Sequence, residues 1–141
     1  MSRAKNIMTE EPVMLPGTST AAEAVQLLQA LEIRHLPVVN EQLEVVGMLS
    51  DRDLRGLSVP RSIGEEWLGE LRGALETPIS RIMSSDVLTV TEETQTSEII
   101  DLMVEHRVGA LPVVNSEGTL VGIVSYLDVL RALRELEADE E

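Results

Sequence analysis

The sequence has no cysteine, which excludes disulfide bonds, thiolate zinc sites and cysteine nucleophiles. Aromatic residues are nearly absent too, because Trp67 and Tyr126 are the only ones in the chain. Proteins that bind single-stranded nucleic acid stack bases on several aromatic side chains, so this class is disfavoured. No apolar run approaches the roughly 18 residues of a membrane span, and residues 1–11 lack the apolar stretch of a signal peptide. We expect a cytoplasmic protein with no membrane partner.

Positive charge is scarce, because 11 Lys and Arg residues face 25 Asp and Glu residues in a chain of net charge −14. Such a field repels phosphate backbones, so nucleic acid is not an expected partner. A bound anion must be held by a few local cations and backbone amides. Part of the acidity lies in residues 135–141, which we interpret as a solvated, frayed tail. Hydrophobic residues make up 43% of the chain, which is enough for a core.

An internal repeat with a constant offset of 75 positions organises the chain. The match needs no gap, so chance does not account for it. The recurring positions are Ile7-Met8 and Ile82-Met83, Leu36–Asn40 and Leu111–Asn115, Val46-Gly47 and Val121-Gly122, Ser50 and Ser125, and Asp53 and Asp128.

Each repeat predicts the element order β-α-β-β-α. In the first repeat a short strand over 13–15 precedes a helix whose apolar face holds Ala24, Leu27, Leu28 and Leu31. Thr20 and Glu23 fit a capping box at the start of that helix. Two strands around a turn follow, and a second helix begins near Ser50. The first strand of the second repeat is expected over 87–90.

The predicted fold class is therefore α+β, with two β-α-β-β-α repeats packed about a pseudo-twofold axis that creates two clefts. A unit of about 50 residues is marginal alone, which favours such packing. Between the repeats, residues 58–64 are predicted as loop and 65–76 as helix, with Trp67 in a core or a dimer contact. The expected boundaries are 1–57 for the first repeat, 58–77 for the loop and helix, 78–134 for the second repeat and 135–141 for the acidic tail.

Two motifs, each present twice, resemble the CBS domain family, named for cystathionine β-synthase. One is Leu36-Pro37-Val38-Val39-Asn40, and the other is Gly47-Met48-Leu49-Ser50-Asp51-Arg52-Asp53. Their copies start at Leu111 and Gly122, and the resemblance spans Ile7 to Leu133. It implies a non-catalytic module that often dimerises and binds AMP, ADP or ATP, or else S-adenosylmethionine or NAD. Such modules commonly regulate an attached or partner enzyme, channel or transporter.

The Ser-x-x-Asp turns, Ser50 with Asp53 and Ser125 with Asp128, are the candidate ligand sites. One carboxylate can accept hydrogen bonds from both hydroxyls of a ribose, and helix N-terminal amides favour a phosphate. The alternative is that the serines and aspartates only cap the helices. Arg52 could pair with a phosphate, whereas its counterpart Leu127 cannot. Arg52 could instead balance a neighbouring aspartate.

The resemblance also implies that each cleft draws on both repeats. The Asp53 cleft would be completed by residues 78–83, and the Asp128 cleft by residues 5–8. The residues before each proline would line the clefts and read adenine with backbone groups, where Gly109 opens space that Arg34 fills. His35 could approach phosphates there or serve the structure alone. The remaining candidate contacts are Arg81, Met83, Met8, Leu36, Ala110 and Leu111.

No catalytic or metal pattern accompanies these motifs. His35 and His106 are far apart in sequence, and no P-loop, Gly-x-Gly-x-x-Gly or Ser-His-Asp order is present. We predict a homodimeric adenine-nucleotide sensor with no required cofactor, which controls a partner protein. The alternatives are a ligand-free dimerisation or interaction module, and a sensor of S-adenosylmethionine or NAD.

Overall fold

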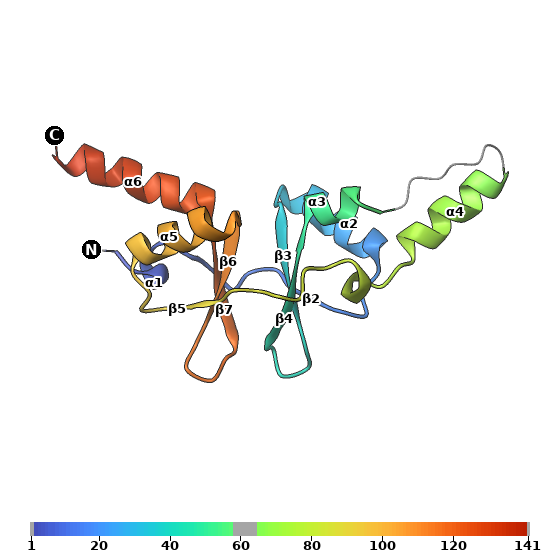
Figure 1. Cartoon of the computed structure of the whole chain (residues 1–141), viewed down its shortest axis with the longest axis horizontal. Coiled ribbons are helices and arrows are strands. Elements are labelled where there is room, and N and C mark those ends of the chain that lie inside the picture. Colours follow the sequence, from blue (N-terminus) through green and yellow to red (C-terminus); the bar gives the residue numbers. More distant parts are fainter. Residues whose placement is uncertain (1, 58–64, 141) are drawn as a thin grey trace. The chain divides into compact units, whose positions relative to one another are not determined.

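The computed structural model describes residues 2–57 and 65–140, apart from the side chains of 65–68 and 140. It separates into two compact units (Figure 1). The central unit comprises residues 13–87, and the terminal unit combines the residues before Val13 with those after Val87. Within the described ranges, no helix is long and apolar enough to cross a membrane. The elements are α1 (Ala4–Ile7), β1 (Thr9–Glu10), β2 (Leu15–Pro16), α2 (Ala21–Leu31), β3 (His35–Val39), β4 (Val45–Ser50), α3 (Asp51–Arg55), α4 (Glu65–Leu75), the 3-10 helix η1 (Ile79–Arg81), β5 (Val90–Thr91), α5 (Thr96–His106), β6 (Ala110–Val114), β7 (Leu120–Ser125) and α6 (Tyr126–Glu140).

The central unit has a three-stranded sheet in the order β2-β3-β4. Strands β2 and β3 are parallel, and β3 and β4 form an antiparallel hairpin. Thr20 Oγ1 accepts a hydrogen bond from Glu23 N (3.2 Å), which starts α2 as predicted. The apolar face of α2 packs on the sheet, although Leu31 in its last turn is exposed. The buried cluster consists of Ala24, Leu28, Leu36, Val38, Leu49 and Ile79.

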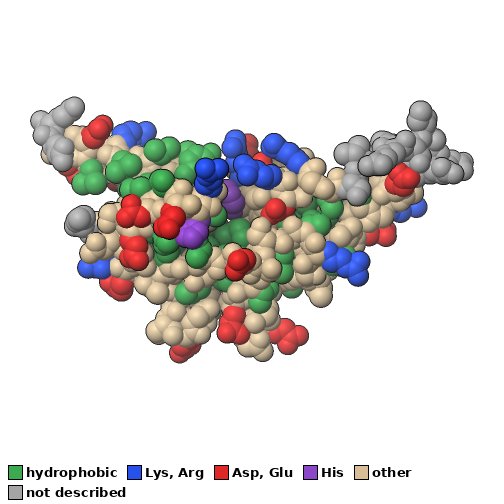
Figure 2. All heavy atoms as spheres, viewed as in Figure 1, with side chains coloured by type: hydrophobic (Ala, Val, Ile, Leu, Met, Phe, Trp, Pro, Cys, Tyr) green, Lys and Arg blue, Asp and Glu red, His purple; other side chains and the backbone are tan. Residues whose placement is uncertain are grey.

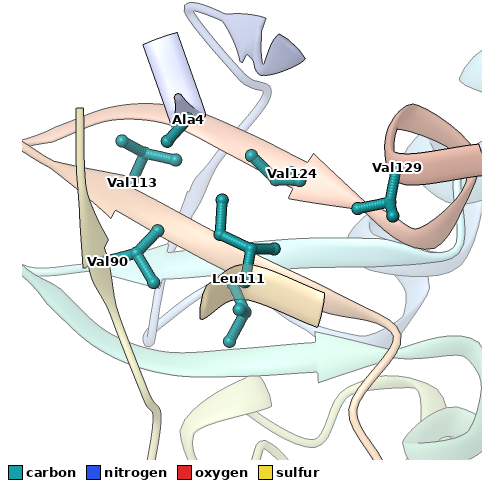
Figure 3. Packing of buried hydrophobic residues seen from close by; sticks show 7 residues of the cluster. Ala4, Val90, Leu111, Val113, Val124 and Val129 are labelled. Atoms are coloured by element: carbon teal, nitrogen blue, oxygen red, sulfur yellow. The ribbon is translucent and has the colours of Figure 1, made fainter. Parts of the chain in front are cut away.

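The terminal unit has a four-stranded sheet in the order β1-β7-β6-β5. Its β6–β7 hairpin pairs Ala110 with Ser125, as the β3–β4 hairpin pairs His35 with Ser50. Figure 3 shows how valine and leucine side chains from both hairpin strands meet Ala4 and Val129. The buried cluster consists of Ala4, Val90, Ile99, Leu111, Val113, Val124 and Val129.

The two repeats exchange their leading segments, so each unit contains sequence from both. Ala4 is fully buried in the terminal unit, where its N–H donates to Thr94 O (2.8 Å). Its counterpart Ile79 is fully buried in the central unit and donates to Ser19 O, also at 2.8 Å. The same main-chain bond thus occurs twice with the repeats reversed.

The exchange continues along the sheet edges. Thr9 of β1 pairs antiparallel with Ile123 of β7 in the terminal unit. In the central unit, Ser84 forms an antiparallel bridge with Met48 of β4, and both of its main-chain bonds are 2.9 Å long. Each hairpin is therefore completed at its edge by the leading segment of the other repeat.

The structure confirms the α+β class and the helix predicted over 65–76, observed as α4. The leading strands are shorter than predicted: β2 begins only at Leu15, and β5 covers Val90 and Thr91. Residues 135–140 are helical rather than an irregular tail, because α6 continues through residues of high helix propensity. The predicted loop 58–64 and the predicted packing of the Trp67 side chain lie outside the described residues.

Candidate nucleotide site

Ser50 and Asp53 form a reciprocal cap at the start of α3. Ser50 N donates to Asp53 Oδ2 (2.9 Å), and Asp53 N donates to Ser50 Oγ (3.2 Å). The short hydroxyl and carboxylate satisfy amides that the first helical turn leaves without partners. Among the described residues, none donates a hydrogen bond to Asp53 Oδ1. The capping role is thus present, and it fixes the carboxylate with one oxygen still able to accept.

Ser125 and Asp128 repeat this cap at the start of α6, with one difference. Ser125 N and Ser125 Oγ both donate to Asp128 Oδ2, at 2.8 and 3.1 Å. Arg131 Nη1 lies 3.8 Å from Asp128 Oδ1. The second oxygen of Asp128 therefore already has a cation nearby, whereas Asp53 forms no ion pair with the residues that the structure describes.

Main-chain bonds hold the residues before each proline against these turns. Asp51 N donates to Arg34 O (3.0 Å), and Tyr126 N donates to Gly109 O (3.0 Å). His35, opposite Ser50 in the hairpin, is half-buried. Burial lowers the pKa of His35 below its ordinary value of 6.5, and Arg34 lowers it further, although Asp51 and Asp53 oppose this. The imidazole is therefore largely neutral at pH 7.

Leu36 and Leu111 cannot offer their side chains to a ligand. Both side chains are fully enclosed in the buried clusters, with exposures of 0% and 1%. Ala110 is also buried. These exposures include the main-chain atoms, so the predicted ligand contacts of Leu36, Ala110 and Leu111 stay predictions.

The exchanged segments bring a methionine to each sheet. A Cβ added to Gly47 would stand 2.2 Å from Met83 Sδ, and one added to Gly122 would stand 2.4 Å from Met8 Sδ. Each thioether thus lies directly on a strand glycine. Met83 shares the central unit with Asp53, and Met8 shares the terminal unit with Asp128. Contact of either methionine with an adenine ring stays a prediction.

The packing of each methionine on a strand glycine was not predicted from the sequence. Val46-Gly47 and Val121-Gly122 recur at the same offset as the two Ile-Met pairs. That shared recurrence was the available signal. The recurrence alone does not predict which glycine contacts which methionine, because that depends on the exchange of leading segments between the repeats.

Cations gather around α3, and Figure 2 shows blue side chains over this element. Arg55 Nη2 pairs with Asp51 Oδ2 at 3.0 Å, so Asp51 is balanced by Arg55 rather than by Arg52. Arg52 is exposed and forms no ion pair within residues 2–57 and 65–140. Arg81 in η1 is likewise exposed. No group of three or more metal-ligating side chains occurs in the described part of the chain.

Comparison with known proteins identifies this arrangement. Residues 4–59 and 79–135 each match the CBS domain. The chain belongs to the CBS domain family. A 17.7 kDa uncharacterised protein of Acidianus ambivalens is 30% identical to this CBS pair over 132 residues, which cover 94% of this chain and 73% of that protein. Several other relatives are longer, and this CBS pair spans less than two thirds of their length.

Solved structures share the fold of this CBS pair. AcuB from Vibrio cholerae has a TM-score of 0.81 and 33% identity, with 99% of this chain and 96% of that chain covered. CBSX2 from Arabidopsis thaliana, solved in complex with AMP, has a TM-score of 0.81 and 25% identity, with 97% and 99% covered. CBS pair proteins are typically regulatory modules.

Proposed function

We propose that this CBS pair is a non-catalytic regulatory module that binds an adenine nucleotide at the Asp53 turn. One observation carries the proposal: the cap fixes Asp53 through Oδ2 and leaves Oδ1 able to accept. A carboxylate that is already positioned loses little freedom when it accepts hydrogen bonds from the two ribose hydroxyls. The AMP complex of CBSX2 supports this choice of ligand class.

Other groups of the central unit can bind the phosphate and the adenine ring of a nucleotide. Arg52 is exposed without an ion pair in the described residues, so it can meet a phosphate with its planar donors. Half-buried Met83 offers a polarisable surface to an adenine ring. Main-chain atoms before Pro37 can read the adenine edge. The Asp128 turn, with Met8 and Ala110, would form a second site.

The proposed mechanism of regulation is a population shift. A ligand held by Asp53 of the first repeat and Met83 of the second favours conformations in which both are in place. The module would act in the cytoplasm as a homodimer and alter a partner protein. We retain 1–57 and 78–134 as the proposed repeat boundaries.

Isothermal titration of the wild type with AMP, ADP, ATP and S-adenosylmethionine tests the proposal. Asp53→Asn is the informative variant, because the amide oxygen can still accept from Ser50 N and preserve the cap. We expect it to weaken nucleotide binding about 10-fold or more, since a charged acceptor is lost. Asp86→Asn, at an exposed site in the same unit, is the matched control. If none of the four compounds binds at a ligand concentration of about 1 mM, the proposal is contradicted.

A second candidate function, a protein-interaction module, is favoured by the exposed leucines of α6. Leucines 48%, 54%, 41% and 53% exposed follow one another at positions 127, 130, 133 and 136. Exposed apolar stripes of this kind mark interaction surfaces. Leu133→Glu should lower the sedimentation coefficient if a dimer uses this face, while leaving nucleotide titrations unchanged.

A further inference from the structure

The side chains around the two Ser-x-x-Asp turns differ at each position near the Asp53 turn that holds an arginine or a histidine. Four such positions surround the Asp53 turn, and none of their counterparts 75 residues later is basic. The counterparts are uncharged, and two of them are leucines. The pairs are Arg34 and Gly109, His35 and Ala110, Arg52 and Leu127, and Arg55 and Leu130.

The backbone around these positions is the same in both units. The main-chain bond from Asp51 N to Arg34 O is 3.0 Å long, as is its equivalent from Tyr126 N to Gly109 O. Both hairpins also share their register at the end that meets the turn. The two turns therefore hold their carboxylates on the same main-chain geometry, but the charges of the surrounding side chains differ.

A phosphate would meet different surroundings in the two units. In the central unit, Arg52 is exposed and forms no ion pair with the described residues. In the terminal unit the equivalent Leu127 is 48% exposed and offers no donor. Arg131 already lies 3.8 Å from Asp128 Oδ1, and Lys5, in the segment expected to complete that cleft, is paired with Glu93 at 2.9 Å. A phosphate beside Asp128 would thus add like charge in a chain of net charge −14.

We propose that the two units select different adenosine compounds: the central unit takes a phosphorylated nucleotide, and the terminal unit takes an adenosine derivative without a phosphate. This inference rests on the proposed function, since it needs both aspartates to hold a ribose. The ribose and adenine contacts are shared, and the cations around α3 decide the rest. One chain would then report two different metabolite classes.

Titrations with AMP and adenosine test the proposal on two variants that each retain one turn. Asp128→Asn leaves the central site, which should bind AMP at least about 10-fold more tightly than adenosine because of the added ion pair. Asp53→Asn leaves the terminal site, which should prefer adenosine by a similar factor. AMP affinity for the central site should fall with added salt, whereas adenosine affinity for the terminal site should not.

Exchanging the charge makes the test specific. Arg52→Leu in the Asp128→Asn background should weaken AMP about 10-fold and leave adenosine unchanged, and Leu127→Arg in the Asp53→Asn background should strengthen AMP. Arg72→Leu, at an exposed position of α4, is the charge-matched control. The same preference in both single-site variants would overturn the proposal while leaving the proposed function intact. Failure of the wild type to bind either compound would overturn this proposal, and the proposed function would fall with it if ADP, ATP and S-adenosylmethionine also failed to bind.

Discussion

Replacing either strand glycine by alanine should destabilise the protein, because each new Cβ would meet the methionine that packs on that strand. At Gly47 the three nearest atoms to a new Cβ all belong to the Met83 side chain, at 2.2 to 2.9 Å. A flexible thioether can swing away, so we expect the methionine contact by itself to cost about 1 kcal/mol. At Gly122 the new Cβ would meet Met8 and also Thr9 O, 3.1 Å away.

Thr9 belongs to β1, which is paired with β7, so its carbonyl cannot move without disturbing that ladder. We therefore expect Gly122→Ala to cost about 3 kcal/mol, near the upper end for overpacking. Alanine also lowers the conformational entropy of the unfolded chain, which favours the folded state by about 0.5 to 1 kcal/mol at either glycine. Urea denaturation followed by circular dichroism gives both free energies of unfolding.

A double-mutant cycle isolates the contact at Gly47. Met83→Ala alone should cost about 1 to 2 kcal/mol, since the side chain is only half-buried. In the Gly47→Ala background the methionine has already been displaced, so the second substitution should cost almost nothing. Additive costs within about 0.5 kcal/mol would refute the reasoning.

Three further predictions follow from the hydrogen bonds, the burial and the exchange. Thr20→Ala removes the cap on Glu23 N and should lower the free energy of unfolding by about 1 kcal/mol, whereas Thr20→Ser should restore it; equal urea midpoints for all three proteins would contradict this. Because the folded pKa of His35 lies below 6.5, the unfolded chain binds its proton first, so His35 contributes stability above pH 6.5 that is lost as pH falls through the folded pKa. His35→Asn should remove this part of the pH dependence, and parallel curves for variant and wild type would disprove it. A fragment of residues 13–87 should unfold cooperatively, whereas the equally long fragment 1–75, which lacks Ile79 and its neighbours, should not; equal cooperativity in calorimetry would count against the exchange.

Much of the fold could be predicted from the sequence because its signals are local. The repeat, the helix face containing Ala24 and Leu28, and the Thr20 cap all depend on spacing along one element. The extent of α6 could have been predicted as well. No Gly or Pro follows Gly122, so nothing in the sequence ends the helix at residue 134.

The exchange of leading segments has no comparable signal in residue type. Its bonds, such as Ala4 N to Thr94 O, join main-chain atoms that every non-proline residue possesses. Physical reasoning on the sequence could not choose between the two units for these segments, and the family resemblance supplied the expectation. At the site, Ser50 and Asp53 have residue types that suit both a cap and a ligand, so the sequence could not separate these roles.

The duplication itself separates what folding requires from what it leaves open. The bond to Arg34 O and its equivalent at Gly109 O use carbonyl oxygens, so the hairpin-to-helix connection is the same with arginine or with glycine. Arg52 and Leu127 are both exposed beside equivalent caps, and neither belongs to a buried cluster. Within one chain, therefore, the scaffold tolerates either side chain at these positions. Their difference in charge changes what each turn can hold, and a ligand is the agent that would distinguish them.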